Sequence, residues 1–139
     1  MKKALFLLFA AFAPLTAMAQ EARPFDVKVV NDEYKIYIRM NLHDKNLTVP
    51  GQSVLGEVDG YIASTQSRST WIIISSEITG ENTARIDVVN DYGSEDFTAE
   101  VKLNKDGTYS YKKLDGSTLK FAVKGKWQKI PGSLTFIRK

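Results

Sequence analysis

The sequence predicts an all-β fold, an antiparallel up-and-down meander of about eight to nine strands that forms a small closed or partly open barrel. Apolar and polar residues alternate along most of the chain, which is the pattern of half-buried strands. Short turns, many bearing glycine, separate these segments, and no stretch predicts a helix. A two-sheet β-sandwich is the alternative, because the run Trp71–Ile74 is apolar on both faces.

The first 19 residues predict a secretory signal peptide. Lys2 and Lys3 precede a short apolar run at residues 4–13, and the small-x-small triplet at residues 17–19 fits a cleavage site before Gln20. The apolar run is shorter than the roughly 20 residues of a membrane-spanning helix, which argues against an uncleaved anchor. We therefore expect an exported bacterial protein, periplasmic or secreted.

Residues 20–139 are expected to form one all-β domain that is large enough to bury its own core. The chain has no cysteine, so neither a disulfide nor a lipid-bearing cysteine is available. No later stretch is long and apolar enough to span a membrane as a helix, so we expect no transmembrane segment.

Charge is distributed unevenly along this domain. From Gln20 to Glu100 there are 7 basic and 14 acidic residues, whereas Val101 to Lys139 contains 10 basic and 2 acidic ones. One interpretation is that the outer faces of neighbouring strands pair their charges. The other is a positive face that meets an anionic partner, such as a polyanionic glycan or a membrane surface.

In the first half of the domain, alternation predicts strands at residues 25–29, 34–42 and 54–63. The connection at residues 43–53 contains Pro50-Gly51 and is expected to be a loop. A strand at residues 71–74 follows, then strands at 84–88 and, after an acidic loop at 90–96, three segments between 97 and 123.

These three segments can be aligned from side-chain parity. A three-residue loop at 105–107 sets Leu103 opposite Tyr109 and puts the apolar residues on one face, with Gly107 in the left-handed position. The same reasoning makes residues 114–116 a second loop and sets Tyr111 opposite Leu119, and the strand that follows this loop is expected to run on past Val123 to Trp127.

The remaining residues predict two further features. Residues 130–133 suit a type II turn, and a two-residue loop there sets Trp127 opposite Phe136 on a final strand at 134–137. The predicted interior holds eight rings: Phe25, Tyr34, Phe97, Tyr109, Tyr111, Phe121, Trp127 and Phe136.

The residues that carry chemistry favour a protein that is not an enzyme. The chain has one histidine, His43, and no cysteine, which leaves nucleophilic catalysis and zinc binding without their usual groups. Glu57 and Asp59 are two apart on one strand, and a solvated face explains them more simply than an acid–base pair. The loop at residues 90–96 lacks the spacing of an EF-hand and is expected to be a polar hairpin loop, with a weak cation site as the alternative. No metal or cofactor is expected.

The predicted binding residues are lysines and aromatic residues. Parity places Lys102, Lys112 and Lys120 in one outward row across three strands. Three aromatic residues fall opposite the main apolar stripes, where exposed rings stack on sugars or anchor proteins; they are Tyr37, Tyr61 and Trp71.

The first functional hypothesis is an exported, non-enzymatic binding protein of the cell envelope that holds a protein or glycan partner, with no role in nucleic-acid binding. The alternatives are an inhibitor of secreted peptidases that uses the loop at residues 43–53, and a lipocalin-like carrier of a small apolar ligand. An enzyme that uses Glu57 and Asp59 is the least supported hypothesis.

Overall fold

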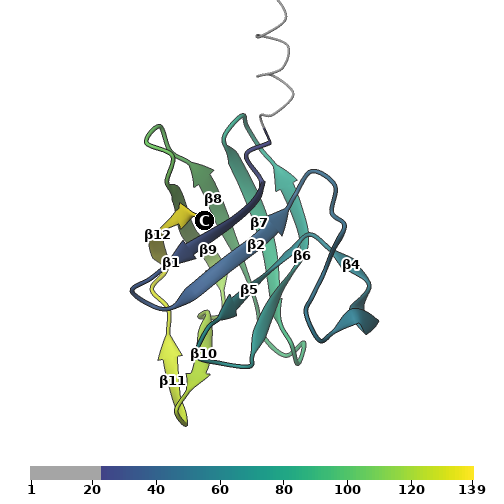
Figure 1. Ribbon diagram of the computed structural model, residues 1–139, viewed down its shortest axis with the longest axis vertical. Coiled ribbons are helices and arrows are strands. Elements are labelled where there is room, and N and C mark those ends of the chain that lie inside the picture. The colour runs from purple at the N-terminus through teal and green to yellow at the C-terminus, as the bar shows by residue number, and fades with distance from the viewer. Residues whose placement is uncertain (1–22) are drawn as a thin grey trace, which may run out of the picture.

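Eight antiparallel strands close into a barrel in the computed structural model, which describes residues 23–139 (Figure 1). The predicted signal peptide at residues 1–19 lies outside the described residues. The first barrel strand pairs with the last, Val29 lying opposite Arg138 and Val30 opposite Ile137. The predicted barrel is therefore confirmed, and the sandwich alternative is not needed.

The barrel strands follow one another around the barrel in the order β1-β12-β9-β8-β7-β6-β5-β2. Their bounds are Asp26–Asn31 for β1, Ile36–Asn41 for β2, Gly60–Ser64 for β5, Thr70–Ile78 for β6, Thr83–Asn90 for β7, Asp96–Leu103 for β8, Tyr109–Gly116 for β9 and Ser133–Arg138 for β12.

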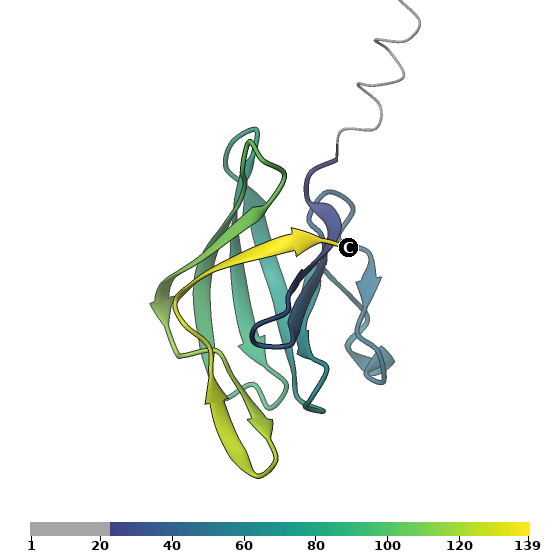
Figure 2. The same cartoon turned by 60° about the vertical axis from the view of Figure 1, so that its left-hand side comes forward.

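Two small hairpins leave this barrel (Figures 1 and 2). The first pairs β3 with β4 and carries a short 3-10 helix, η1, between them; the bounds are Leu47–Thr48, Glu57–Val58 and Ser53–Leu55. The second pairs β10, Lys120–Val123, with β11, Lys126–Lys129, and projects from the barrel in both views. The single strand predicted at residues 54–63 was thus wrong, because its first half belongs to the β3–β4 excursion.

Inward side chains fill the barrel. Six of the eight rings predicted for the interior are buried there, Tyr34 packs at its edge, and Trp71 joins them. A chain of ring contacts crosses the core: Trp71 to Phe97 with centroids 5.5 Å apart, Phe97 to Tyr111 at 6.4 Å and Tyr111 to Phe136 at 6.1 Å. The aromatic core therefore occupies space that a carried ligand would need.

The first predicted turn of the central meander is confirmed. Leu103 lies opposite Tyr109, and Glu100 lies opposite Lys112. Asn104 and Gly107 close the turn with a backbone hydrogen bond, and the φ of Gly107 is +88°. Apolar alternation and the glycine together fixed this register.

The second predicted turn is wrong. Instead of folding back at residue 114, β9 continues along β8 to Gly116, which lies opposite Phe97 beyond a bulge between Thr98 and Ala99. The other side of β9 is taken by β12, with Leu134 opposite Tyr111. Side-chain parity was applied only to segments that are neighbours in sequence. For the same reason Phe136 was predicted to lie opposite Trp127, whereas it lies opposite Tyr109.

The doubly apolar run at residues 71–74 also has a local explanation. Trp71 and Ile73 point into the core, whereas Ile72 is buried on the outer side opposite Tyr61. A register shift between Ile73 and Ser75 leaves Ile74 outside and 56% exposed. The bulge, and not a second sheet, accounts for the pattern.

The β3–β4 excursion is braced against the barrel. The buried amide of Asn41 accepts hydrogen bonds from the backbone N–H groups of His43 and Asp44, and Lys45 Nζ donates to the Ser76 carbonyl. Its tip exposes Val54, at 94% of its surface. The peptidase-inhibitor hypothesis requires such a braced loop and stays a prediction. Between residues 23 and 139 the chain contains no helix with the length and apolarity to cross a membrane.

Candidate binding surface on the β10–β11 hairpin

The β10–β11 hairpin is formed by a two-residue turn. Lys124 and Gly125 both have positive φ, +52° and +78°, as a type I′ turn requires. The turn sets Val123 opposite Lys126 and Ala122 opposite Trp127. Directly opposite residues share a face, so the register gives this hairpin two distinct sides.

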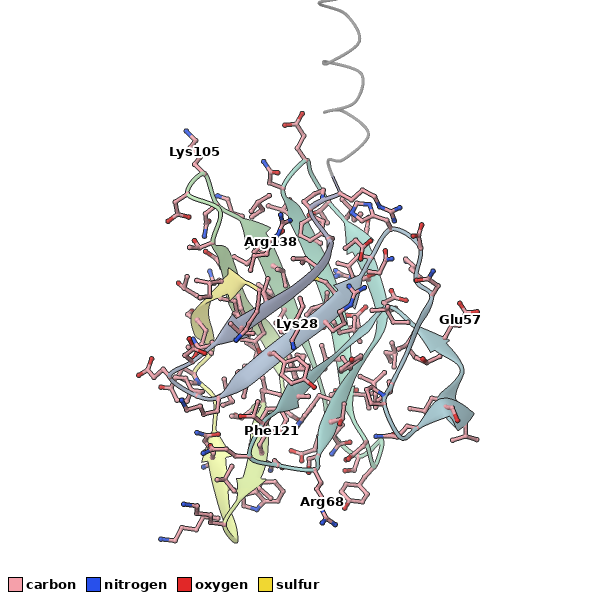
Figure 3. The ribbon with its side chains drawn as sticks, in the orientation of Figure 1. Lys28, Glu57, Arg68, Lys105, Phe121 and Arg138 are labelled. Carbon is pink, nitrogen blue, oxygen red and sulfur yellow. The ribbon has the colours of Figure 1, made fainter. Side chains whose placement is uncertain are left out.

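The inner side anchors the hairpin to the barrel. Phe121 is fully buried in the core, between Leu119 and Ile130, which are also buried. Ile130 N donates a hydrogen bond to the Leu119 carbonyl, and Trp71 Nε1 donates to the Lys120 carbonyl at 3.0 Å. These contacts attach the projecting hairpin to one end of the barrel, where Figure 3 labels Phe121.

The outer side presents cations and one aromatic ring. Lys120, Ala122, Trp127 and Lys129 share this face by register, and Trp127 is 60% exposed. Lys124 lies in the turn, and Lys126 lies opposite Val123 on the other side of the hairpin; both are exposed and extend the positive charge around its tip. No acidic residue follows Asp115 in the sequence. We call Lys120, Lys124, Lys126, Trp127 and Lys129 the hairpin surface.

One ion pair and one ring contact fix the geometry of this surface. Lys120 Nζ lies 3.4 Å from Glu95 Oε2 and 5.0 Å from the centre of the Trp127 ring. A cation over an indole ring is attracted by its negative face. Glu95 and Lys120 together therefore hold Trp127 in place while more than half of its surface remains open to solvent.

The lysines of the hairpin work against its stability. Lys120 lies directly opposite Lys129, and like charges in that position are destabilising. Lys124 takes a left-handed conformation that favours glycine or asparagine. Residues that weaken a local structure often serve function. The unfavourable positions of these lysines therefore favour a functional role for the hairpin surface.

An open hollow of about 490 Å³ adjoins the hairpin. It lies between Ala122 and the β5–β6 loop, which is labelled at Arg68 in Figure 3. The lining side chains of that loop carry hydroxyl, amide and guanidinium groups; they are Thr65, Gln66, Ser67, Arg68 and Ser69. The hollow therefore combines hydrogen-bonding groups with the small apolar wall of Ala122.

The structure places the three predicted lysines on different parts of the molecule. Lys120 belongs to the hairpin surface, but Lys102 lies opposite Ser110 and Lys112 opposite Glu100 on the barrel wall. The predicted row required β10 to pair with β9, and β10 pairs with β11 instead. The row is therefore not formed, although all three side chains reach the surface.

The predicted aromatic residues divide in the same way. Tyr37 and Tyr61 lie half-buried on the outer barrel wall as an edge-to-face pair with centroids 6.3 Å apart, and Lys28 Nζ lies 4.6 Å from the centre of the Tyr37 ring. Burial raises the pKa of the Tyr61 phenol above its ordinary value. Trp71 is 2% exposed, so the expectation of an exposed ring was wrong there.

Trp127 was assigned to the interior from sequence and is instead the exposed ring of the hairpin surface. The signal that could have found it is Lys124-Gly125, a two-residue turn between short segments. Treating residues 117–127 as one strand hid that turn. Alternation from the buried Phe121 would then have placed Ala122 and Trp127 together on the outer side.

The other candidate groups form different arrangements. Glu57 is exposed on β4, whereas Asp59 is buried and accepts a hydrogen bond from Ser76 Oγ at 2.6 Å. The two carboxylates are thus in different environments and do not form a facing pair. His43 Nε2 accepts a hydrogen bond from the Phe25 backbone at 3.1 Å, which gives this histidine a structural contact.

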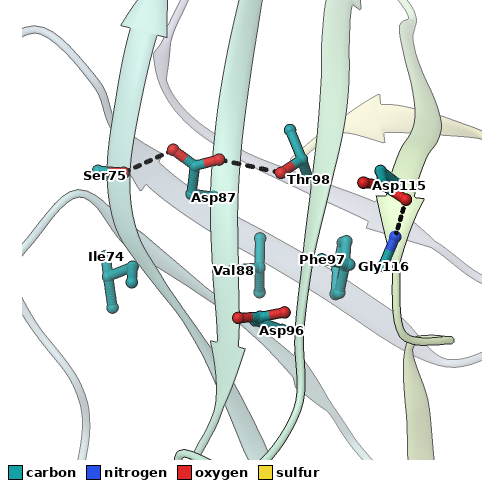
Figure 4. Close-up of a pocket in the computed structure, with 9 residues that line it drawn as sticks. All are labelled: Ile74, Ser75, Asp87, Val88, Asp96, Phe97, Thr98, Asp115 and Gly116. Atoms are coloured by element: carbon teal, nitrogen blue, oxygen red, sulfur yellow. Dashed lines mark hydrogen bonds between the residues drawn. The ribbon is translucent and has the colours of Figure 1, made fainter.

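Carboxylates gather in a hollow of about 360 Å³ outside β6–β9 (Figure 4). Asp87 accepts hydrogen bonds there from Ser75 Oγ at 2.7 Å and Thr98 Oγ1 at 3.1 Å, while Asp96 and Asp115 also line the hollow. Within residues 23–139 no group of three or more histidine, cysteine or acidic residues could hold a metal ion. The cross-strand hydrogen bonds from Ser75 and Thr98 therefore satisfy the carboxylate oxygens of Asp87.

The polar loop at residues 90–96 is organised by Asn90. Its side-chain oxygen accepts hydrogen bonds from Ser94 N at 2.9 Å and Glu95 N at 3.2 Å. These bonds place Glu95 beside Lys120, so the loop supports the hairpin surface.

Comparisons with protein-family models, with curated proteins and with solved structures find no match for this chain.

Proposed function

We propose that this protein is an exported, non-enzymatic binding protein of the cell envelope that holds an anionic partner on the hairpin surface. The observation that carries the proposal is the face on which Lys120 and Lys129 flank an exposed Trp127. Among the described residues, Glu95 alone forms an ion pair with a hairpin lysine. Positive potential concentrated on a projecting hairpin attracts anions from solution.

The packing of the barrel supports surface binding. Rings from several strands occupy the interior, so a small apolar ligand would have to displace core side chains. The hairpin, by contrast, is anchored by Phe121 and presents its outer face without any rearrangement. A binding site held in place before its partner arrives loses less entropy on association.

The test compares two triple variants with equal charge change. In the first, Lys124, Lys126 and Lys129 become serine; in the control, Lys102, Lys105 and Lys112 on the barrel wall and the opposite turn become serine. Binding of residues 20–139 to dextran sulfate and to uncharged dextran is measured by calorimetry. Both triples replace exposed lysines, so neither is expected to disturb the core.

Three exposed charge contacts at about 0.5 kcal/mol each correspond to about a tenfold change in Kd. We therefore expect the hairpin triple to bind dextran sulfate about tenfold more weakly and the control triple to bind within about twofold of wild type. Uncharged dextran should not bind. Equal losses in the two triples, or no binding of dextran sulfate by the wild type, would contradict the proposal.

A further inference from the structure

We propose that the anionic partner is an acidic glycan, whose sugar rings lie against Trp127 and in the hollow beside Ala122. This inference rests on the proposed function, because it names the partner of the same surface. It is carried by the juxtaposition of an exposed ring, a hollow lined by hydroxyl and amide groups, and cations on one end of the barrel.

Trp127 is the stacking platform. Its ring is steadied by the Lys120 ammonium 5.0 Å from its centre, and the residue remains 60% exposed. An indole face offers a large, flat apolar area at low entropic cost, which matches the C–H face of a pyranose ring. Stacking on Trp127 does not depend on charge. It therefore favours an acidic sugar over anions that have no flat apolar face.

The hollow supplies the hydrogen bonds. Five consecutive polar residues, 65–69, line it, with Ala122 directly opposite Trp127 on the hairpin. The loop is already ordered, because Gln66 N donates to Ser64 Oγ at 3.0 Å and Ser69 N donates to Ser67 Oγ at 3.2 Å. A preformed set of donors and acceptors suits the hydroxyl groups of a sugar better than it suits a lipid chain.

A cation in the hollow and a second on the adjoining hairpin face match acidic sugars. Arg68 lines the hollow itself, and its planar guanidinium can hold a carboxylate through two hydrogen bonds. Lys129 lies on the same face of the hairpin as Ala122. A membrane surface fits less well, because interfacial binding requires a broad apolar face, and Trp127 is the one large apolar residue exposed on this hairpin.

The experiment fills the hollow without changing charge. Ala122→Leu places a larger side chain in it, and Ala122→Ser is the matched control of nearly unchanged size. Ala122 is exposed, so both variants should fold, as circular dichroism checks. Calorimetry measures binding to oligogalacturonate, a neutral galactose oligosaccharide of equal length, polyglutamate and phosphatidylglycerol vesicles.

We expect the wild type to bind oligogalacturonate and Ala122→Leu to bind it about tenfold more weakly, which is about 1.4 kcal/mol. Ala122→Ser should stay within about twofold of wild type. Trp127→Ala should lose a similar amount, and Gln66→Ala with Ser67→Ala provides a second test of the hollow should the leucine variant misfold.

The outcomes separate the two proposals. If polyglutamate or the vesicles bind as tightly as oligogalacturonate, and neither the Ala122 nor the Gln66 variants weaken binding, the glycan inference is overturned while the anionic surface stands. If no anion binds, both proposals fail. Equal binding of the neutral oligosaccharide would also overturn the assignment of an acidic sugar.

Discussion

Replacing Gly116 by alanine tests the register that the structure assigns to β8 and β9. Gly116 has φ +100° and faces Phe97 across the ladder. A Cβ atom added there would lie 2.5 Å from the Asp96 carbonyl oxygen and 2.7 Å from Phe97 Cα. Both are backbone atoms of the neighbouring strand, so the strand itself must shift to relieve the contact.

Gly107 provides a matched control, because it also has positive φ, +88°, but a Cβ atom there meets nothing within 4 Å. Alanine in the left-handed region costs about 1–2 kcal/mol, which both variants lose. A forced backbone shift in a packed sheet adds about 1–3 kcal/mol more. We expect the free energy of unfolding to fall by about 1–2 kcal/mol for Gly107→Ala and by about 2–5 kcal/mol for Gly116→Ala.

Equilibrium urea denaturation of both variants measures the difference, with an unchanged m-value confirming the same unfolding transition. The comparison removes the common strain of positive φ and leaves the steric effect of the facing strand. Equal losses in the two variants would show that Gly116 does not face Phe97, as it would not if residues 114–116 formed the simple turn predicted from sequence.

Two further predictions concern buried aromatic residues. Burial raises the pKa of the Tyr111 phenol above its ordinary value of 10.0, so the folded state holds this proton more tightly and its contribution to stability is complete below pH 10. This contribution to the free energy of unfolding is lost as the pH rises above 10, at up to about 1.4 kcal/mol per pH unit. The free energy of unfolding of Tyr111→Phe, measured by urea denaturation, should therefore fall less steeply with alkaline pH than that of wild type. Equal slopes for the two proteins would contradict this. Trp71→Phe removes the donor to the Lys120 carbonyl and should cost about 1–3 kcal/mol by the same assay. It leaves Trp127 as the sole tryptophan, whose emission should respond to oligogalacturonate, and stability within about 0.5 kcal/mol of wild type would argue against the hydrogen bond.

The turn at residues 105–107 shows where sequence reasoning succeeds. Alternation in the flanking segments allows one register that keeps Leu103 and Tyr109 on the same face, and Gly107 can take the positive φ that closes it. Both signals lie within a few residues of the turn. Local information is sufficient when the partner strand is also the next one in sequence.

The candidate site shows where it fails. Lys120 was predicted as a binding residue and lies on the hairpin surface, but Lys102 and Lys112 lie elsewhere because β9 pairs with β12. The exposure of Trp127 was missed because it depends on residues 120–129 forming a separate hairpin. The burial of Phe121 in a core assembled from distant strands fixes the position of that hairpin.

The sequence alone determined the all-β class and the basic character of the C-terminal half, since periodicity and composition are properties of the chain itself, whereas the structure decided that the first strand closes on the last. Tertiary structure decided that β12 enters beside β9 and that residues 120–129 leave the barrel as a separate hairpin. The physical reason is that each strand has two edges, and alternation does not specify which distant segment fills the second one. That choice brings Trp127, the lysines and the polar loop at residues 65–69 to one end of the barrel.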